Sequence, residues 1–162
     1  PSMDLEKARE IAKANGVVPK DHWGPGKIIA ELCDEHCEPN LAEPTFIMYY
    51  PVEVSPLAKA HRDDPHLTER FELVVARREL GNAYSELNDP IEQRLRMEEE
   101  VKAQQAGDDE ASDLDEEYIR ALEYALPPTG GLGIGIDRLI MLLAETSTIR
   151  DVILFPTLRP EN

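Results

Sequence analysis

The stretch Phe71–Glu86 constrains the fold most, because its composition predicts a β-hairpin that carries carboxylates. Residues Phe71–Val75 have the β-branched and aromatic side chains of a strand, and Glu79–Tyr84 can return beside it. A two-residue turn at Ala76 and Arg77 would join the two strands and fix their register. The hairpin predicts an antiparallel sheet as the centre of the fold.

In that register Val74 faces Glu79, so Glu72 and Glu79 are diagonal neighbours on one face of the sheet. Two carboxylates held that close repel each other unless a cation lies between them. Hard oxygen ligands that leave room for phosphate oxygens and water suit Mg²⁺. The alternative interpretation is that both are surface glutamates paired with Arg77 and Arg78.

Simple alternation along the second strand separates the polar side chains. It places Glu79 on one face of the sheet and Asn82, Tyr84 and Glu86 on the other. For all four to line one pocket, the strand needs a bulge, and we expect it at Gly81.

Composition limits the classes of protein to which the chain can belong. Its 162 residues suffice for one domain with a hydrophobic core, and 41% of them are hydrophobic. A net charge of −16 repels polyphosphate, which argues against a nucleic-acid clamp. No apolar run has membrane-spanning length and the start shows no signal peptide, so we expect no membrane partner. Two cysteines form no disulfide framework, and the expected location is cytoplasmic.

Two clusters of polar residues are interpreted without a function. Residues 98–117 hold ten acidic residues against one base, a pattern typical of a solvated helix face and loop. Cys33, His36 and Cys37 share one helical face, but no second Cys/His cluster exists to complete a metal site. We therefore expect Cys33 in the core and His36 in solvent.

Hydrophobic periodicity predicts helices and strands around the hairpin. Four helices are expected, over Asp4–Asn15, Gly26–Cys37, Pro90–Ala106 and Leu114–Leu126. Asp89 is the expected N-cap of the third, and the Asp113–Glu116 pattern caps the fourth. Two further strand-like stretches are Pro44–Pro51 and Val152–Phe155.

The stretch Gly130–Leu143 predicts a strand with one bare face that runs into a helix. The bare face consists of alternating glycines, at Gly131, Gly133 and Gly135. The helix starts near Asp137, which places Arg138 at the junction. The spacing fits neither a Walker A loop nor a dinucleotide fingerprint. Either a flat or bulky ligand approaches the bare backbone, or helix and strand pack closely with Arg138 on the surface.

A glycine-alternating strand that runs into a helix opening with Asp-Arg resembles motif 3 of the class II aminoacyl-tRNA synthetases. Within that class, several stretches resemble the lysyl-tRNA synthetase family: Trp23–Leu32, Glu43–Pro51, Tyr50–Lys59, Phe71–Pro90, Pro127–Leu143 and Thr148–Pro160. The resemblance implies an α+β fold, an incomplete antiparallel sheet flanked by helices. Residues 1–162 would be the C-terminal part of the catalytic domain.

The resemblance also implies roles for the hairpin residues. Glu72 and Glu79 match the acidic pair that holds Mg²⁺ bridging the ATP phosphates. Asn82 matches the residue near the carboxylate of the substrate lysine, and Tyr84 matches an aromatic wall of the lysine pocket. Glu86 matches the carboxylate that receives the ε-ammonium group. A buried counter-charge at fixed reach selects a long cationic side chain, because an uncharged analogue would leave that carboxylate unpaired.

Arg138 matches the motif 3 arginine, the catalytic residue that stacks on adenine and lies near the γ-phosphate. Gly131, Gly133 and Gly135 would form the floor under ATP. In the implied reaction, the lysine carboxylate attacks the α-phosphorus of ATP, and the lysyl group then passes to the 3′ end of tRNA-Lys. No protein nucleophile is needed, so catalysis would come from positioning and from electrostatic stabilisation by Mg²⁺ and arginine.

Three parts of the family have no counterpart here: the anticodon-binding domain, motif 1 with its homodimer interface, and motif 2. We therefore expect the chain alone to be inactive, and a homodimer for the full-length protein. Two alternatives remain, a tRNA-independent paralogue that lysylates elongation factor P and a non-catalytic binding module. Against the binding module, the carboxylates, the amide and the arginine of the implied site occur together, at Glu72, Glu79, Asn82, Glu86 and Arg138.

Overall fold

The computed structural model describes residues 4–108 and 111–157. Asp109 and Glu110 of the acidic run, and residues 158–160 of the C-terminal resemblance, lie outside the described residues. The helices are α1 (Leu5–Ala14), α2 (Pro25–His36), α3 (Pro90–Gln105), α4 (Glu116–Glu123) and α5 (Ile136–Leu143). The strands are β1 (Thr45–Met48), β2 (Arg70–Val75), β3 (Arg78–Ser85) and β4 (Gly130–Ile134). Three short 3₁₀ turns are η1 (Glu38–Asn40), η2 (Val52–Val54) and η3 (Ile149–Asp151).

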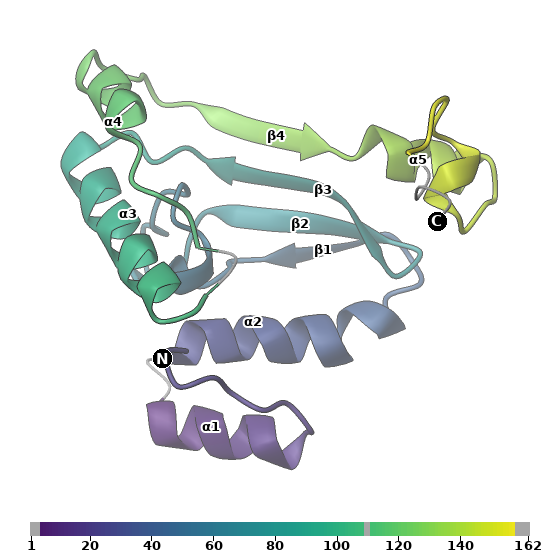
Figure 1. Cartoon of the computed structure of the whole chain (residues 1–162), viewed down its shortest axis with the longest axis horizontal. Coiled ribbons are helices and arrows are strands. Elements are labelled where there is room, and N and C mark those ends of the chain that lie inside the picture. Colours follow the sequence, from purple (N-terminus) through teal and green to yellow (C-terminus); the bar gives the residue numbers. More distant parts are fainter. Residues whose placement is uncertain (1–3, 109–110, 158–162) are drawn as a thin grey trace, which may run out of the picture.

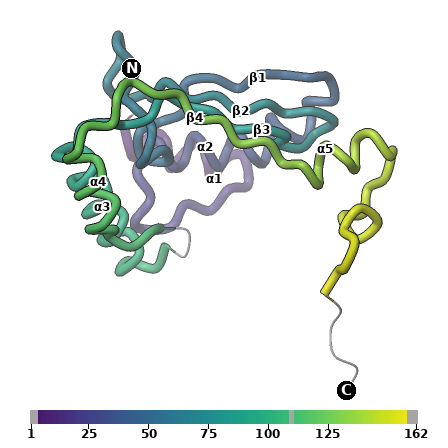
Figure 2. Tube along the Cα trace, turned by 90° about the horizontal axis from the view of Figure 1, so that it is seen from above, coloured from purple at the N-terminus to yellow at the C-terminus, as the bar shows by residue number. Residues whose placement is uncertain are grey.

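The four strands form one antiparallel sheet in the order β1-β2-β3-β4 (Figure 1). Helix α2 faces one side of the sheet with α1 behind it, α3 and α4 lie at one end of the sheet, and α5 follows β4 at the other end (Figure 1 and Figure 2). Strands and helices thus occupy separate regions, and the α+β fold class is confirmed.

The β2–β3 hairpin has the predicted turn and register. Ala76 and Arg77 have φ values of 51° and 64°, the left-handed conformation that a two-residue hairpin turn requires. Val74 pairs with Glu79, as expected from the sequence. Glu72 and Glu79 therefore lie on the same face of the sheet.

A bulge in β3 exists, but it lies one residue before the expected position. Leu73 pairs with Gly81 and Val74 with Glu79, so Leu80 is the extra residue. Gly81 itself stays in the ladder, where a Cβ atom would lie 3.2 Å from the carbonyl oxygen of Gly133. The glycine thus permits close approach of β4, and the bulge shifts to its neighbour.

Two sequence predictions at helix and strand ends are wrong. Helix α4 begins at Glu116, later than expected, because the Asp115 side chain accepts hydrogen bonds from the amides of Glu117 and Tyr118. The stretch Val152–Phe155 forms no strand. It follows η3, which packs against α5, and there the chain leaves the sheet and has no strand to pair with (Figure 2).

The face of the sheet toward α2 carries the polar side chains of Glu72, Glu79 and Asn82. A small buried cluster lies between α1 and α2, formed by Ala8, Ala12, Trp23 and Ile28. The opposite face of the sheet exposes apolar side chains, of which Phe46 and Leu132 are 59% and 66% exposed. None of the described helices is long and apolar enough to cross a membrane.

Glu53 in η2 holds the start of helix α2. Its two carboxylate oxygens accept hydrogen bonds from the amides of Gly26 (3.0 Å) and Lys27 (3.3 Å). A carboxylate at a helix N-terminus satisfies free amides and interacts favourably with the helix dipole. At Gly24 and Gly26 a Cβ atom would lie within 2.9 Å of Glu53 side-chain atoms, so both glycines make room for it.

Substitution of Glu53 tests this cap. In Glu53→Ala, we expect hydrogen–deuterium exchange at the amides of Gly26 and Lys27 to accelerate by about fivefold, since a helix cap contributes about 1 kcal/mol. Glu31→Ala is the control, because it removes only the Glu31–Lys27 ion pair (3.1 Å) on the same helix. Equal protection of the two amides in both variants would contradict the capping role.

Candidate functional site

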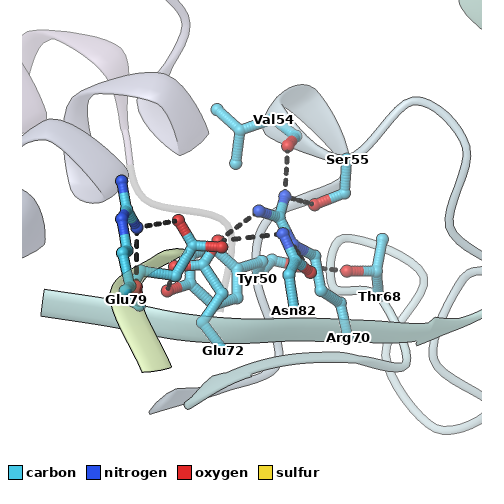
Figure 3. Close-up of polar contacts among 9 residues, drawn as sticks. Tyr50, Val54, Ser55, Thr68, Arg70, Glu72, Glu79 and Asn82 are labelled. Atoms are coloured by element: carbon cyan, nitrogen blue, oxygen red, sulfur yellow. Dashed lines mark hydrogen bonds and ion pairs between the residues drawn. The ribbon is translucent and has the colours of Figure 1, made fainter. Parts of the chain in front are cut away.

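The carboxylate of Glu72 lies on the face of the sheet that is turned toward α2, and three side chains donate to it (Figure 3). The Tyr50 hydroxyl donates to Oε2 at 2.8 Å, and Nδ2 of Asn82 donates to Oε1 at 3.4 Å. The guanidinium group of Arg70 forms an ion pair with Oε1. Glu72 is 8% exposed, so these contacts compensate for the burial of its charge.

Arg70 makes four further interactions from the same position on β2. Its Nη1 atom donates to the carbonyl oxygen of Val54 (2.7 Å) and to Oγ of Ser55 (2.9 Å). Its Nε atom donates to Oδ1 of Asn82 at 3.2 Å. The guanidinium carbon lies 4.4 Å from the centre of the Tyr50 ring, which is cation–π geometry. Arg70 thus joins the η2 turn to both Glu72 and Asn82.

Glu79, further along the same face, is paired with Arg138 of helix α5. Nη1 of Arg138 donates to the Glu79 carbonyl oxygen at 2.6 Å and approaches its Oε2 at 3.4 Å. The side chains of Arg138 and Glu79 are 50% and 38% exposed, so their ion pair adds little stability. The two glutamates thus form ion pairs with Arg70 and Arg138, whereas the alternative interpretation expected Arg77 and Arg78.

A cavity of about 820 Å³ borders both glutamates. Its wall combines acidic and basic side chains, including Glu38, Glu72, Glu79, Arg70 and Arg138. Burial and then the nearby carboxylates of Asp34, Glu72 and Glu79 raise the pKa of Glu38. Negative charge in this cavity is therefore incompletely compensated by its own arginines.

Glu86 lies beyond the end of β3, above the bare face of β4. A Cβ atom on Gly131 would lie 2.1 Å from Oε1 of Glu86, so the carboxylate rests directly on the glycine. Strand pairing places Tyr84 opposite Gly131 and Asn82 opposite Gly133 on that face. Burial raises the pKa of the Glu86 carboxyl group.

The bulge brings the predicted side chains to one face, where they border neighbouring hollows. Glu72 and Glu79 border the 820 Å³ cavity, whereas Glu86 borders a separate cavity of about 520 Å³. Tyr84 lines a third hollow with Gly131. The single pocket stays a prediction, because the hollows beside Tyr84 and Glu86 adjoin one another along the open surface of the β4 glycines.

Three polar residues next to the site were missed by sequence reasoning: Arg70, Tyr50 and Tyr118. Arg70 lies two residues before Glu72, and strand alternation could have placed both on one face. Tyr50 comes from a separate segment, and only the tertiary fold brings it to Glu72. Burial and then the charge of Glu86 raise the pKa of Tyr118 on α4, which places this tyrosine near the Glu86 carboxylate.

The donor set of Glu72 and Glu79 fits Mg²⁺. Mg²⁺ commonly takes one or two protein carboxylates and fills its other positions with phosphate oxygens and water. Two carboxylates from adjacent strands border a cavity of about 820 Å³, which leaves space for such ligands. Within residues 4–108 and 111–157, no group of three or more His, Cys, Asp or Glu is placed to hold a metal ion, so phosphate oxygens and water would have to complete the coordination.

Cys33, His36 and Cys37 lie at the C-terminal end of α2. Cys33 is partly buried, and burial together with Cys37 raises the pKa of its thiol to about 12. The ring of His36 is exposed, with Nε2 2.9 Å from the carbonyl oxygen of Asn15. The solvent position of His36 is confirmed, whereas Cys33 is only partly buried and does not belong to the buried cluster between α1 and α2.

Comparison with known proteins places this sheet in a family. Residues 5–159 match the family model described as tRNA synthetases class II (D, K and N). The chain belongs to this family. It is 54% identical over 159 residues to a lysine–tRNA ligase of Leuconostoc mesenteroides and 55% identical over 158 residues to one of Gloeobacter violaceus. Each alignment covers 98% of this chain, and the chain spans 32% of the length of each relative.

The raised pKa of Glu86 predicts a pH-dependent effect on stability. Because burial disfavours the charged form, folding is opposed once the pH rises through the raised pKa, and this cost is absent below the ordinary glutamate pKa. We expect Glu86→Gln to raise the Tm at pH 7 and the gain to vanish at acidic pH. Thermal unfolding from pH 3 to pH 8 measures it.

The matched control is Glu123→Gln, an exposed glutamate on α4. An equal gain in Tm for both variants at pH 7 would show that net charge, and not burial of Glu86, causes the effect.

Proposed function

We propose that the whole protein to which this chain belongs is a lysine–tRNA ligase. The observation that carries the proposal is the position of Glu86 on Gly131, next to Tyr84, in a chain whose relatives at 52–55% identity are named lysine–tRNA ligases. The chain spans about a third of the length of those relatives, so the proposal concerns the whole protein.

Lysine recognition follows from charge and reach in this proposal. Glu86 receives the ε-ammonium group, Tyr84 flanks the aliphatic stem, and Asn82 interacts near the α-carboxylate. A partly buried carboxylate discriminates against uncharged analogues, because their binding would leave it without a counter-charge.

ATP binds along the same face in this proposal. Glu72 and Glu79 hold Mg²⁺, which when bound neutralises the phosphate charge and favours departure of pyrophosphate. Arg138 stacks on adenine and lies near the γ-phosphate, for which a planar guanidinium group is suited. The backbone at Gly131, Gly133 and Gly135 supports the nucleotide, since no side chain blocks its approach.

The reaction then needs orientation and charge stabilisation from the protein. The lysine carboxylate attacks the α-phosphorus in line, and lysyl-adenylate and pyrophosphate form. The 3′ end of tRNA-Lys then accepts the lysyl group. Binding both reactants on one rigid sheet supplies the proximity that such a displacement requires.

The proposal extends to location and assembly. Transfer to tRNA places the protein in the cytoplasm, where the free cysteines Cys33 and Cys37 remain reduced. The tRNA contacts and the homodimer interface are assigned to the remaining two thirds of the whole protein.

Lysine-dependent ATP–pyrophosphate exchange by the whole protein tests the function. We expect exchange with lysine, and a fall of about a hundredfold or more in kcat/KM for lysine in Glu86→Gln, because the ammonium group loses its buried counter-charge. Glu123→Gln, on the exposed face of α4, should exchange at the unaltered rate.

The outcomes separate the alternatives. Exchange without aminoacylation of tRNA-Lys, but with lysylation of elongation factor P, would identify the tRNA-independent paralogue. Absence of exchange, together with ATP binding, would favour the binding module.

The β4 glycines give a second, graded test. Gly131→Ala should raise the KM for lysine by about tenfold, since its Cβ atom would lie 2.1 Å from Oε1 of Glu86 and displace the carboxylate. In Gly130→Ala the added Cβ atom would lie on the other face of β4 with no protein atom within 4 Å, and should leave the KM for lysine unchanged. The same KM in both variants would contradict the proposed place of Glu86.

A further inference from the structure

We propose that Arg70 is a positioning residue, which holds the Glu72 carboxylate and the Asn82 amide in one fixed arrangement for lysine activation. This inference rests on the proposed function, since it assigns Glu72 to the metal and Asn82 to the lysine substrate. Under the proposed function, Arg70 itself touches neither ATP nor lysine. It acts through the two side chains that do.

The contacts of Arg70 divide its guanidinium group into an anchored side and a working side. On the anchored side, Nη1 donates to the Val54 carbonyl oxygen (2.7 Å) and to Oγ of Ser55 (2.9 Å). On the working side, Nη2 contacts Oε1 of Glu72 and Nε donates to Oδ1 of Asn82 (3.2 Å). The planar group therefore transmits the position of the η2 turn to both side chains.

The arrangement fixes the orientation of both side chains. Oδ1 of Asn82 accepts from Arg70, so its Nδ2 must point toward Glu72, to which it donates at 3.4 Å. This contact and the fixed fork of Arg70 together remove the freedom of the amide to flip. Asn82 can then present only one orientation to a bound substrate.

The same contacts determine which oxygen of Glu72 is open to a metal. Oε1 accepts from Arg70 and Asn82, whereas Oε2 accepts only from the Tyr50 hydroxyl at 2.8 Å. An ionised carboxylate has about four acceptor sites, two on each oxygen, so these donors leave one site, on Oε2. Arg70 thus directs that single site and keeps the carboxylate from rotating.

A lysine at position 70 could not perform this task. An ammonium group is a point charge with three donors, whereas the planar guanidinium fork contacts four acceptors here, from Val54, Ser55, Glu72 and Asn82. The side chain of Arg70 is 16% exposed, so solvent cannot replace the lost donors freely. Residues that orient metal-binding carboxylates commonly contribute tenfold to a hundredfold to metal affinity or activity.

The experiment uses the whole protein and measures exchange while Mg²⁺ and lysine are varied separately. For Arg70→Lys we expect the Mg²⁺ concentration at half-maximal rate and the KM for lysine each to rise by about tenfold. Arg94→Lys is the matched control, because Arg94 also forms a two-pronged pair with a carboxylate, that of Glu116 at 2.7 and 2.6 Å, between α3 and α4. Both values should be unchanged in Arg94→Lys.

Chemical rescue distinguishes positioning from general support of the fold. In Arg70→Ala, added guanidinium ion at millimolar concentration should restore part of the exchange rate, and it should not do so in Arg94→Ala. A purely structural role would lower the Tm and the rate without moving the Mg²⁺ dependence, and would show no rescue.

Failure of the two proposals is distinguishable. If the unaltered protein shows no lysine-dependent exchange, the proposed function is overturned and the role of Arg70 with it. If the unaltered protein exchanges but Arg70→Lys keeps the Mg²⁺ dependence and the KM for lysine, only the positioning role is overturned. Should the Arg70 variants fail to fold, Ser55→Ala removes one anchor and must produce a smaller shift in the same two quantities, or the proposal is wrong.

Discussion

The guanidinium group of Arg70 is the interaction on which the polar face of the sheet depends. Glu72 is 8% exposed, and a carboxylate at that depth is costly unless charged or polar donors surround it. Arg70 supplies the charge, and Tyr50 and Asn82 supply further donors. Arg70 donates to the η2 turn, and Glu53 of that turn accepts from the start of α2. The position of Glu72 on β2 is therefore coupled to helix α2 through these two contacts. Local polar contacts thus connect the layers of this part of the fold.

The backbone of the sheet makes this face polar through one irregularity. Without the bulge at Leu80, residues before and after it would project from opposite faces, and Glu79 would be separated from Asn82. In β4, by contrast, the glycines opposite Asn82 and Tyr84 add no side chains to this face and leave its surface open. On this face β3 provides the polar side chains, and the glycines of the adjacent β4 leave the space that a ligand of the proposed kind requires.

Sequence reasoning predicted the parts that short-range rules govern. The turn at Ala76 and Arg77, the pairing of Val74 with Glu79 and the cap at Asp89 follow from local geometry, and the structure has them. The predicted strand at Val152–Phe155 failed because a strand needs a partner edge, which hydrophobic content alone does not reveal. Tyr50 was missed for a related reason, since its contact with Glu72 spans 22 residues and depends on the course of the chain between them. Long-range polar contacts are the part that a single sequence leaves undetermined.

Electrostatics explains why an acidic chain can be proposed to bind ATP. A net charge of −16 opposes polyphosphate binding in general, yet Arg70, Arg77, Arg78 and Arg138 line the same cavity as Glu72 and Glu79. Seven acidic side chains line that cavity against five basic ones, and burial together with the carboxylates of Asp34, Glu72 and Glu79 raises the pKa of Glu38 within it. A divalent cation bound by the two glutamates would change the sign of the local field, and phosphate oxygens would then be attracted to a surface that repels them in its absence. In the proposed site the nucleotide would therefore need the metal to offset the carboxylates, so ATP affinity there should depend on Mg²⁺ more steeply than it would in a site built from arginines alone.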